Sequence, residues 1–178
     1  MSKKTNFIFK VLHIVAWLIF VGLCIEAGGL VVNFVFSIYK PEFIPNLYQK
    51  LDLIEMYNRS QWAFFGMYTF IMSVAILKAY LFYIVIMLMY KLDLSNPFNG
   101  YVSSQITQIS SYTFFIGIVS LIGQEIAKNL QHHGYKTDNL NSFWGDSEAF
   151  ILMAAIIYII AIIFKKGIEI QAENDLTI

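Results

Sequence analysis

The sequence predicts an all-α polytopic membrane protein with four transmembrane helices in an up-down bundle. Four long apolar segments carry this prediction, and they occupy most of the 178 residues. A helix needs about 20 mostly apolar residues to cross about 30 Å of hydrocarbon. Only helices and closed barrels satisfy their backbone hydrogen bonds there. The segments lack the alternating pattern of barrel strands, which extends over about 10 residues.

We expect the spans, in order, at residues 11–39, 62–90, 109–126 and 144–164, within a single membrane domain of residues 1–178. The first span resembles the apolar part of a signal peptide. No small-residue cleavage motif follows it, so we expect an uncleaved helix. Before the third span, Asn96 and Pro97 predict a helix start with Asn96 as the N-cap. Residues 165–178 form a short polar tail.

The composition argues against several classes of protein. Charged residues make up 13% of the chain, against about 25% in soluble domains. The net charge of zero gives no basic surface for direct contact with nucleic acid. Catalytic and nucleotide-binding motifs are absent, and the adjacent His132 and His133 lack the spacing typical of metal ligands. We therefore expect no enzymatic activity, no cofactor and no metal site.

The distribution of basic residues indicates the topology, because cytoplasmic loops carry more lysine and arginine. If both termini are cytoplasmic, the inner side holds Lys3, Lys4, Lys10, Lys91, Lys165 and Lys166. The outer side then holds Lys40, Lys50, Arg59, Lys128 and Lys136. The basic residues next to span ends lie mostly on the inner side. We expect both termini in the cytoplasm.

Polar and small residues recur at helical spacing in the first and third spans. The first set is Gly22, Glu26, Gly29, Asn33 and Ser37; the second is Ser103, Thr107, Ser110, Thr113, Gly117, Ser120 and Gln124. Each set marks one face of a helix. Small residues let helices approach closely in lipid, and hydroxyls and amides form hydrogen bonds between them. We expect both faces to pack against other helices. The alternative is a polar passage or a ligand groove lined by the same residues.

Two charged residues, Glu26 and Lys78, lie deep within the expected spans. Glu26 follows Lys10 by about 24 Å of helix, and Lys78 precedes Lys91 by about 20 Å. Charged residues at such depth usually pair or face water. Three interpretations stay open: a structural ion pair, a proton or ion site, or two charges that never meet. In the third interpretation each charge reaches the membrane surface or is hydrated by itself. Our prediction is that both side chains face the bundle interior at similar depth.

Three segments carry a resemblance to a known family. They are Lys78-Ala-Tyr-Leu-Phe-Tyr, Leu92-Asp-Leu-Ser-Asn-Pro-Phe, and the ending Ile163-Phe-Lys-Lys-Gly-Ile-Glu-Ile-Gln-Ala-Glu-Asn-Asp-Leu-Thr-Ile. Together they resemble the bacterial four-span membrane proteins of domain-of-unknown-function family 2975. The resemblance implies a bacterial cytoplasmic (inner) membrane protein. It also implies a regulatory partner, because members of the family are often encoded beside small helix-turn-helix regulators.

The polar tail is where we expect such a regulatory partner to bind. Lys165 and Lys166 mark the inner boundary of the last span. Beyond them lie the residues expected to dock a partner: Glu169, Glu173, Asn174, Asp175 and Leu176. We interpret the chain as a non-enzymatic sensor or anchor coupled to a cytoplasmic regulator. One alternative is a small proton- or ion-coupled transporter that uses Glu26 and Lys78. For the tail itself, the alternative is a solvated helix end without a partner.

Overall fold

A computed structural model describes residues 3–46, 51, 53–93 and 97–175. Long α-helices make up most of this part of the chain, which confirms the predicted all-α class. The long helices are α1 (Lys3–Tyr39), α3 (Gln61–Lys91), α4 (Gly100–His132) and α6 (Ser147–Asp175). The short elements are η1 (Pro41–Asn46), α2 (Ile54–Arg59), η3 (Asp138–Leu140) and α5 (Asn141–Trp144).

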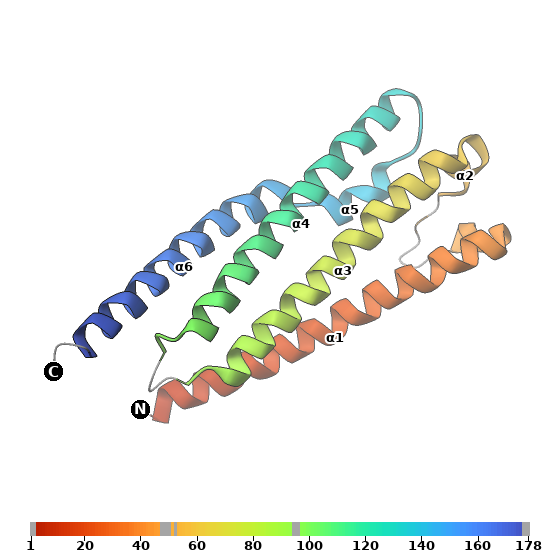
Figure 1. The fold of residues 1–178 in the computed structure, drawn as a ribbon. Coiled ribbons are helices and arrows are strands. Elements are labelled where there is room, and N and C mark those ends of the chain that lie inside the picture. Colours follow the sequence, from red (N-terminus) through yellow and green to blue (C-terminus); the bar gives the residue numbers. More distant parts are fainter. Residues whose placement is uncertain (1–2, 47–50, 52, 94–96, 176–178) are drawn as a thin grey trace.

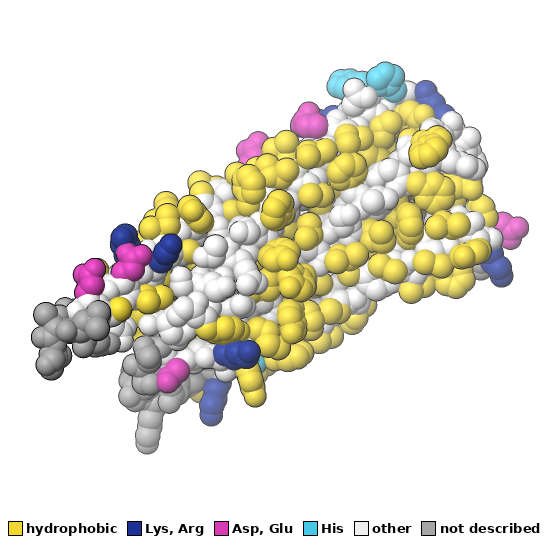
Figure 2. Space-filling model, viewed as in Figure 1, with side chains coloured by type: hydrophobic (Ala, Val, Ile, Leu, Met, Phe, Trp, Pro, Cys, Tyr) yellow, Lys and Arg dark blue, Asp and Glu magenta, His cyan; other side chains and the backbone are white. Residues whose placement is uncertain are grey.

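Four stretches of the chain are long and apolar enough to cross a membrane. They are residues 7–39, 61–91, 100–132 and 138–173. At about 1.5 Å per residue, a helix of this length exceeds the thickness of the hydrocarbon core. Figure 2 shows hydrophobic side chains along the flanks of the molecule and charged side chains mostly toward its two ends. The number of long apolar helices agrees with the four spans predicted from the sequence.

The third long helix begins later than Asn96 and Pro97 predict. Asn99 caps α4, because its side-chain oxygen accepts a hydrogen bond from the Val102 amide at 3.0 Å. Pro97 therefore precedes the helix, and the prediction of Pro97 as its first residue is wrong. Asn96 lies outside the described residues. Two asparagines stand within four residues here, and the sequence signals of a helix start fit both.

Consecutive long helices run in opposite directions and lie in the order α1, α3, α4, α6 (Figure 1). Extensive contacts join α1 to α3, α3 to α4 and α4 to α6. Between α1 and α3, the Tyr68 hydroxyl donates a hydrogen bond to the Leu30 carbonyl oxygen at 3.1 Å. Between α3 and α4, the rings of Tyr80 and Tyr112 lie 4.8 Å apart. The start of α1 and the end of α6 lie at the same end of the molecule (Figure 1).

The opposite end is closed by the connecting segments, which we call the loop cap: residues 40–46, 51, 53–60 and 133–146. An ion pair of 2.7 Å joins Glu55 to Lys136, and the Arg59 guanidinium lies 4.2 Å from the centroid of the Tyr135 ring. Beneath these contacts, apolar residues of the cap join the core of the long helices. The fully buried members from the cap include Ile44, Leu51, Leu53, Met56, Leu140 and Trp144.

Candidate functional site

The two charged residues deep within the expected spans have different surroundings. Both side chains are half-buried. The Lys78 ammonium lies 5.8 Å from the centroid of the Phe150 ring on α6. No ion pair joins Lys78 to Glu26 in the described part of the chain. Lys78 thus points toward the helices α4 and α6, whereas Glu26 belongs to α1, whose extensive helix contacts are with α3.

The close packing of α4 on α6 depends on a glycine. A Cβ atom placed on Gly117 would lie 2.7 Å from Ile151 Cγ1 and 3.1 Å from the Ser147 carbonyl oxygen. About two helical turns before Gly117, the buried Ser110 hydroxyl donates a hydrogen bond to the Ala154 carbonyl oxygen at 2.9 Å. The face of the third span therefore packs against another helix, as predicted, along its stretch from Ser110 to Ser120.

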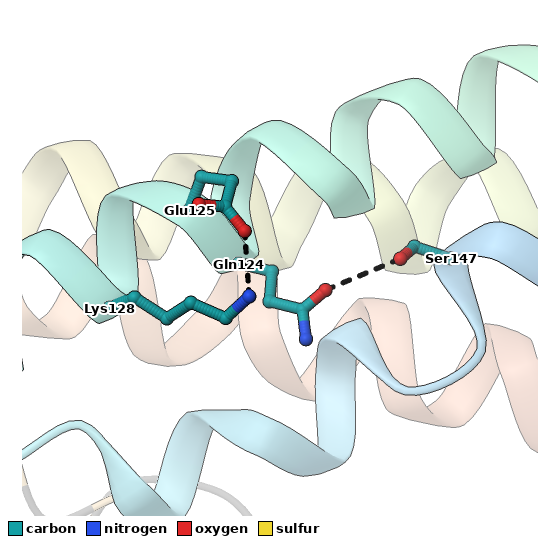
Figure 3. Close-up of polar contacts among 4 residues, drawn as sticks. All are labelled: Gln124, Glu125, Lys128 and Ser147. Atoms are coloured by element: carbon teal, nitrogen blue, oxygen red, sulfur yellow. Dashed lines mark hydrogen bonds and ion pairs between the residues drawn. The ribbon is translucent and has the colours of Figure 1, made fainter.

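The same face continues into a polar cluster beside the loop cap (Figure 3). The Ser147 hydroxyl donates a hydrogen bond of 3.3 Å to Gln124 Oε1, and an exposed ion pair of 2.7 Å joins Glu125 to Lys128. Gln124 and Ser147 also line a shallow polar recess with Asp146, Glu148 and Ala149. Within the described residues, no three His, Cys, Asp or Glu side chains gather as metal ligands would.

The face of the first span is arranged differently. Ser37 is buried, and Glu26, Gly29 and Asn33 are half-buried, but Gly22 is exposed. A Cβ atom on Gly22 would meet no atom within 4 Å. This face of α1 therefore lies beside the surface that contacts α3. The prediction that the whole face packs against other helices is wrong at Gly22.

At the end that holds both termini, α6 continues as a helix beyond Lys165 and Lys166 to Asp175. We call residues 165–175 the tail helix. The side chains of Glu169, Ile170 and Glu173 are exposed on it. An ion pair of 2.6 Å joins Lys166 to Glu169. Asn174 and Asp175 belong to the same helix, while Leu176, also expected to dock a partner, lies outside the described residues.

The base of the tail helix rests on the connection between α3 and α4. The rings of Phe98 and Phe164 lie 5.2 Å apart, and a Cβ atom on Gly167 would lie 2.8 Å from Phe98 Cδ1. The glycine therefore provides the space in which the Phe98 ring sits. We call Phe98, Phe164 and Gly167 the tail seat. Sequence reasoning missed it, although a glycine inside a helical segment is a signal of close packing.

The model of one protein family, described as "Protein of unknown function (DUF2975)", matches residues 46–178. The chain belongs to the DUF2975 family. Searches among curated proteins and among solved structures each found no match. The three segments that carry the resemblance all lie in the matched part, and the structure brings two of them together, since Phe98 contacts Phe164 and Gly167.

The DUF2975 match covers the helices α2 to α6, with Lys78, the tail seat and the tail helix. It begins after α1, so Glu26 lies outside it. The family match therefore includes α3, α4 and α6. It does not include α1, whose features are known from this chain alone.

Proposed function

We propose that this DUF2975 protein is a non-enzymatic membrane anchor whose tail helix docks a cytoplasmic regulator of the helix-turn-helix class. The observation that carries the proposal is the continuity of α6 through the membrane boundary into the tail helix. A docking segment that is already helical loses less conformational entropy on binding than a disordered one. The tail seat holds its base against the connection between α3 and α4.

The side chains of the tail helix define the chemistry of the partner. Glu169 and Glu173 are four residues apart, so they lie on one face of the helix, and both are exposed. Ile170 adds a large apolar side chain with 58% exposure beside them. A partner with basic residues around an apolar contact would complement this surface. The exposed Lys166–Glu169 ion pair contributes little stability, so a partner displaces it at small cost.

The class of the regulator is inferred from the family resemblance. The side of the membrane on which the tail helix lies is inferred from the positions of basic residues. Both termini lie at one end of the molecule, as an even number of spans requires (Figure 1). Lys91, Lys165 and Lys166 lie at the same end. Since basic residues favour the cytoplasmic side, we place the tail helix in the cytoplasm of a bacterial cell, with the loop cap outside. If the protein is a sensor, the loop cap is the part that would receive a signal from outside the cell.

The proposal is tested by coexpression of the full chain with a small helix-turn-helix regulator of the kind that the family resemblance implies. We expect the regulator to co-purify with the detergent-solubilised membrane protein. The variant Glu169→Lys/Glu173→Lys should weaken the interaction by roughly tenfold or more, the equivalent of about 1.4 kcal/mol. Glu148→Lys is the matched control, because Glu148 is an exposed residue at the other end of the same helix.

Two results would refute the proposal. In the first, the regulator does not co-purify with the wild-type chain even at regulator concentrations well above micromolar. The second is equal co-purification by the wild type and the double charge reversal. A transporter that couples Glu26 to Lys78 has less support, because Lys78 lies against Phe150 and no ion pair joins it to Glu26.

A further inference from the structure

The helix α1 lies at the edge of the helix row and has most of its surface uncovered. Only 6% of its most apolar stretch is buried, against 39% for α3. A lipid-facing surface is normally apolar, and the exposed side chains of α1 are mostly so. One strip departs from this rule. We call Gly22, Glu26, Gly29 and Asn33 the polar strip of α1.

The polar strip holds two side chains without partners inside the expected first span. Glu26 and Asn33 are half-buried, and neither has a hydrogen bond or ion pair within the residues that the structure describes. Glu26 lies 13 residues before the end of α1 at Tyr39, about 20 Å along the helix axis. Unpaired polar groups at this depth are costly, which favours a protein surface over lipid as the covering of the strip.

The strip also has the shape of a close contact. Its four residues recur at steps of 4, 3 and 4, so they occupy a narrow face of the helix. Two of the four are glycines. A Cβ atom on Gly22 would meet no atom of this chain within 4 Å, so the glycine does not serve packing within the chain. Glycine on an uncovered face permits the backbone of another helix to approach.

We propose that the polar strip of α1 binds the same strip of a second copy of the chain. Identical chains inserted with one topology are related by a two-fold axis along the membrane normal, so each residue faces its own counterpart at equal depth. An asparagine amide is self-complementary, because it both donates and accepts hydrogen bonds. Two Glu26 carboxyls that share one proton form a hydrogen bond in the same way.

The native cysteine supplies an internal control for this geometry. Cys24 is exposed and lies two residues from both Gly22 and Glu26, hence about 200° around the helix from each. In the proposed dimer Cys24 points away from the partner. Gly22→Cys in a Cys24→Ala background places the thiol in the interface instead. Oxidation of membranes with copper phenanthroline should cross-link two Gly22→Cys chains and leave the wild-type chains without a cross-link, because Cys24 does not face its counterpart.

A second measurement keeps the proposal testable if a cysteine at position 22 hinders close approach. Energy transfer between labelled full-length chains in liposomes reports dimerisation without a new residue in the interface. Glu26→Leu/Asn33→Leu should weaken dimerisation by roughly tenfold, about 1.4 kcal/mol. Glu26→Gln, which keeps the hydrogen bond, should not. The matched control is Ile25→Leu/Val32→Leu, at the same seven-residue spacing on exposed positions.

Either of two results overturns the proposal. The first is cross-linking of Cys24 as efficient as that of Gly22→Cys, which would place the opposite face of α1 in the contact. The second is energy transfer no greater than that expected from random proximity in the liposomes, or unchanged by Glu26→Leu/Asn33→Leu.

Discussion

Gly117 lies at a close contact between α4 and α6. A Cβ atom there would meet Ile151 at 2.7 Å, so Gly117→Leu requires the two helices to separate. Overpacking of a close contact costs about 1–3 kcal/mol. We therefore expect a clear fall in the thermal unfolding temperature of the purified protein in detergent.

Gly66 provides the control for this prediction. It is an exposed glycine in the second turn of α3, and a Cβ atom on it would meet nothing within 4 Å. Gly66→Leu should leave the unfolding temperature unchanged or slightly raised, because leucine is the better helix former. If Gly117→Leu unfolded at the temperature of Gly66→Leu, the close packing of α4 on α6 would not contribute to stability.

The burial of single residues was predictable from the sequence where it depends only on the helical period. The steps of three and four that connect Ser110, Gly117 and Ser120 identified the packed face of α4. The depth of Lys78 was equally predictable, but its direction was not. Tyr68, which bonds to α1, precedes Lys78 by ten residues, so the two side chains point about 80° apart around α3. Equal depth therefore did not bring Lys78 to Glu26.

The tail seat acts at the scale of an element, since it joins the tail helix to the start of α4. Phe98→Ala would remove the ring that contacts Phe164 and fills the space over Gly167. We expect faster amide hydrogen exchange in residues 165–173, because loss of this contact allows the helix end to open locally. Trp62→Ala is the control, as Trp62 is an aromatic residue with 91% exposure. Equal exchange in Phe98→Ala and the wild type would show that the tail helix is stable without its seat.

Long helices were predictable from sequence, whereas the short elements of the loop cap were not. Apolar length alone identifies a span, because the bilayer solvates every span in the same way. The cap depends on contacts distant in sequence, such as Glu55 with Lys136 and Arg59 with Tyr135. The boundaries of α4 also shifted, since two neighbouring asparagines offer a cap and the structure uses Asn99.

At the scale of the whole molecule, the four long helices form a row, and the two helices at its edges differ in their contacts. The edge helix α6 is joined to α4 by glycine packing and the Ser110 hydrogen bond, and it extends into the tail helix. The edge helix α1 is joined to α3 and carries the unpartnered polar strip. The order of helices was not predictable, because apolar spans do not reveal their lateral neighbours. In the account proposed here, one edge binds a cytoplasmic regulator and the other binds a second copy.

The central claim, a membrane anchor with its tail helix in the cytoplasm, is tested most directly by thiol labelling of intact cells. Ala172→Cys in a Cys24→Ala background places a thiol on an exposed position of the tail helix. His132→Cys, exposed at the opposite end, is the control in the same background. A membrane-impermeant reagent should label His132→Cys in intact cells and Ala172→Cys only after permeabilisation. Labelling of Ala172→Cys in intact cells, with His132→Cys protected, would contradict the account.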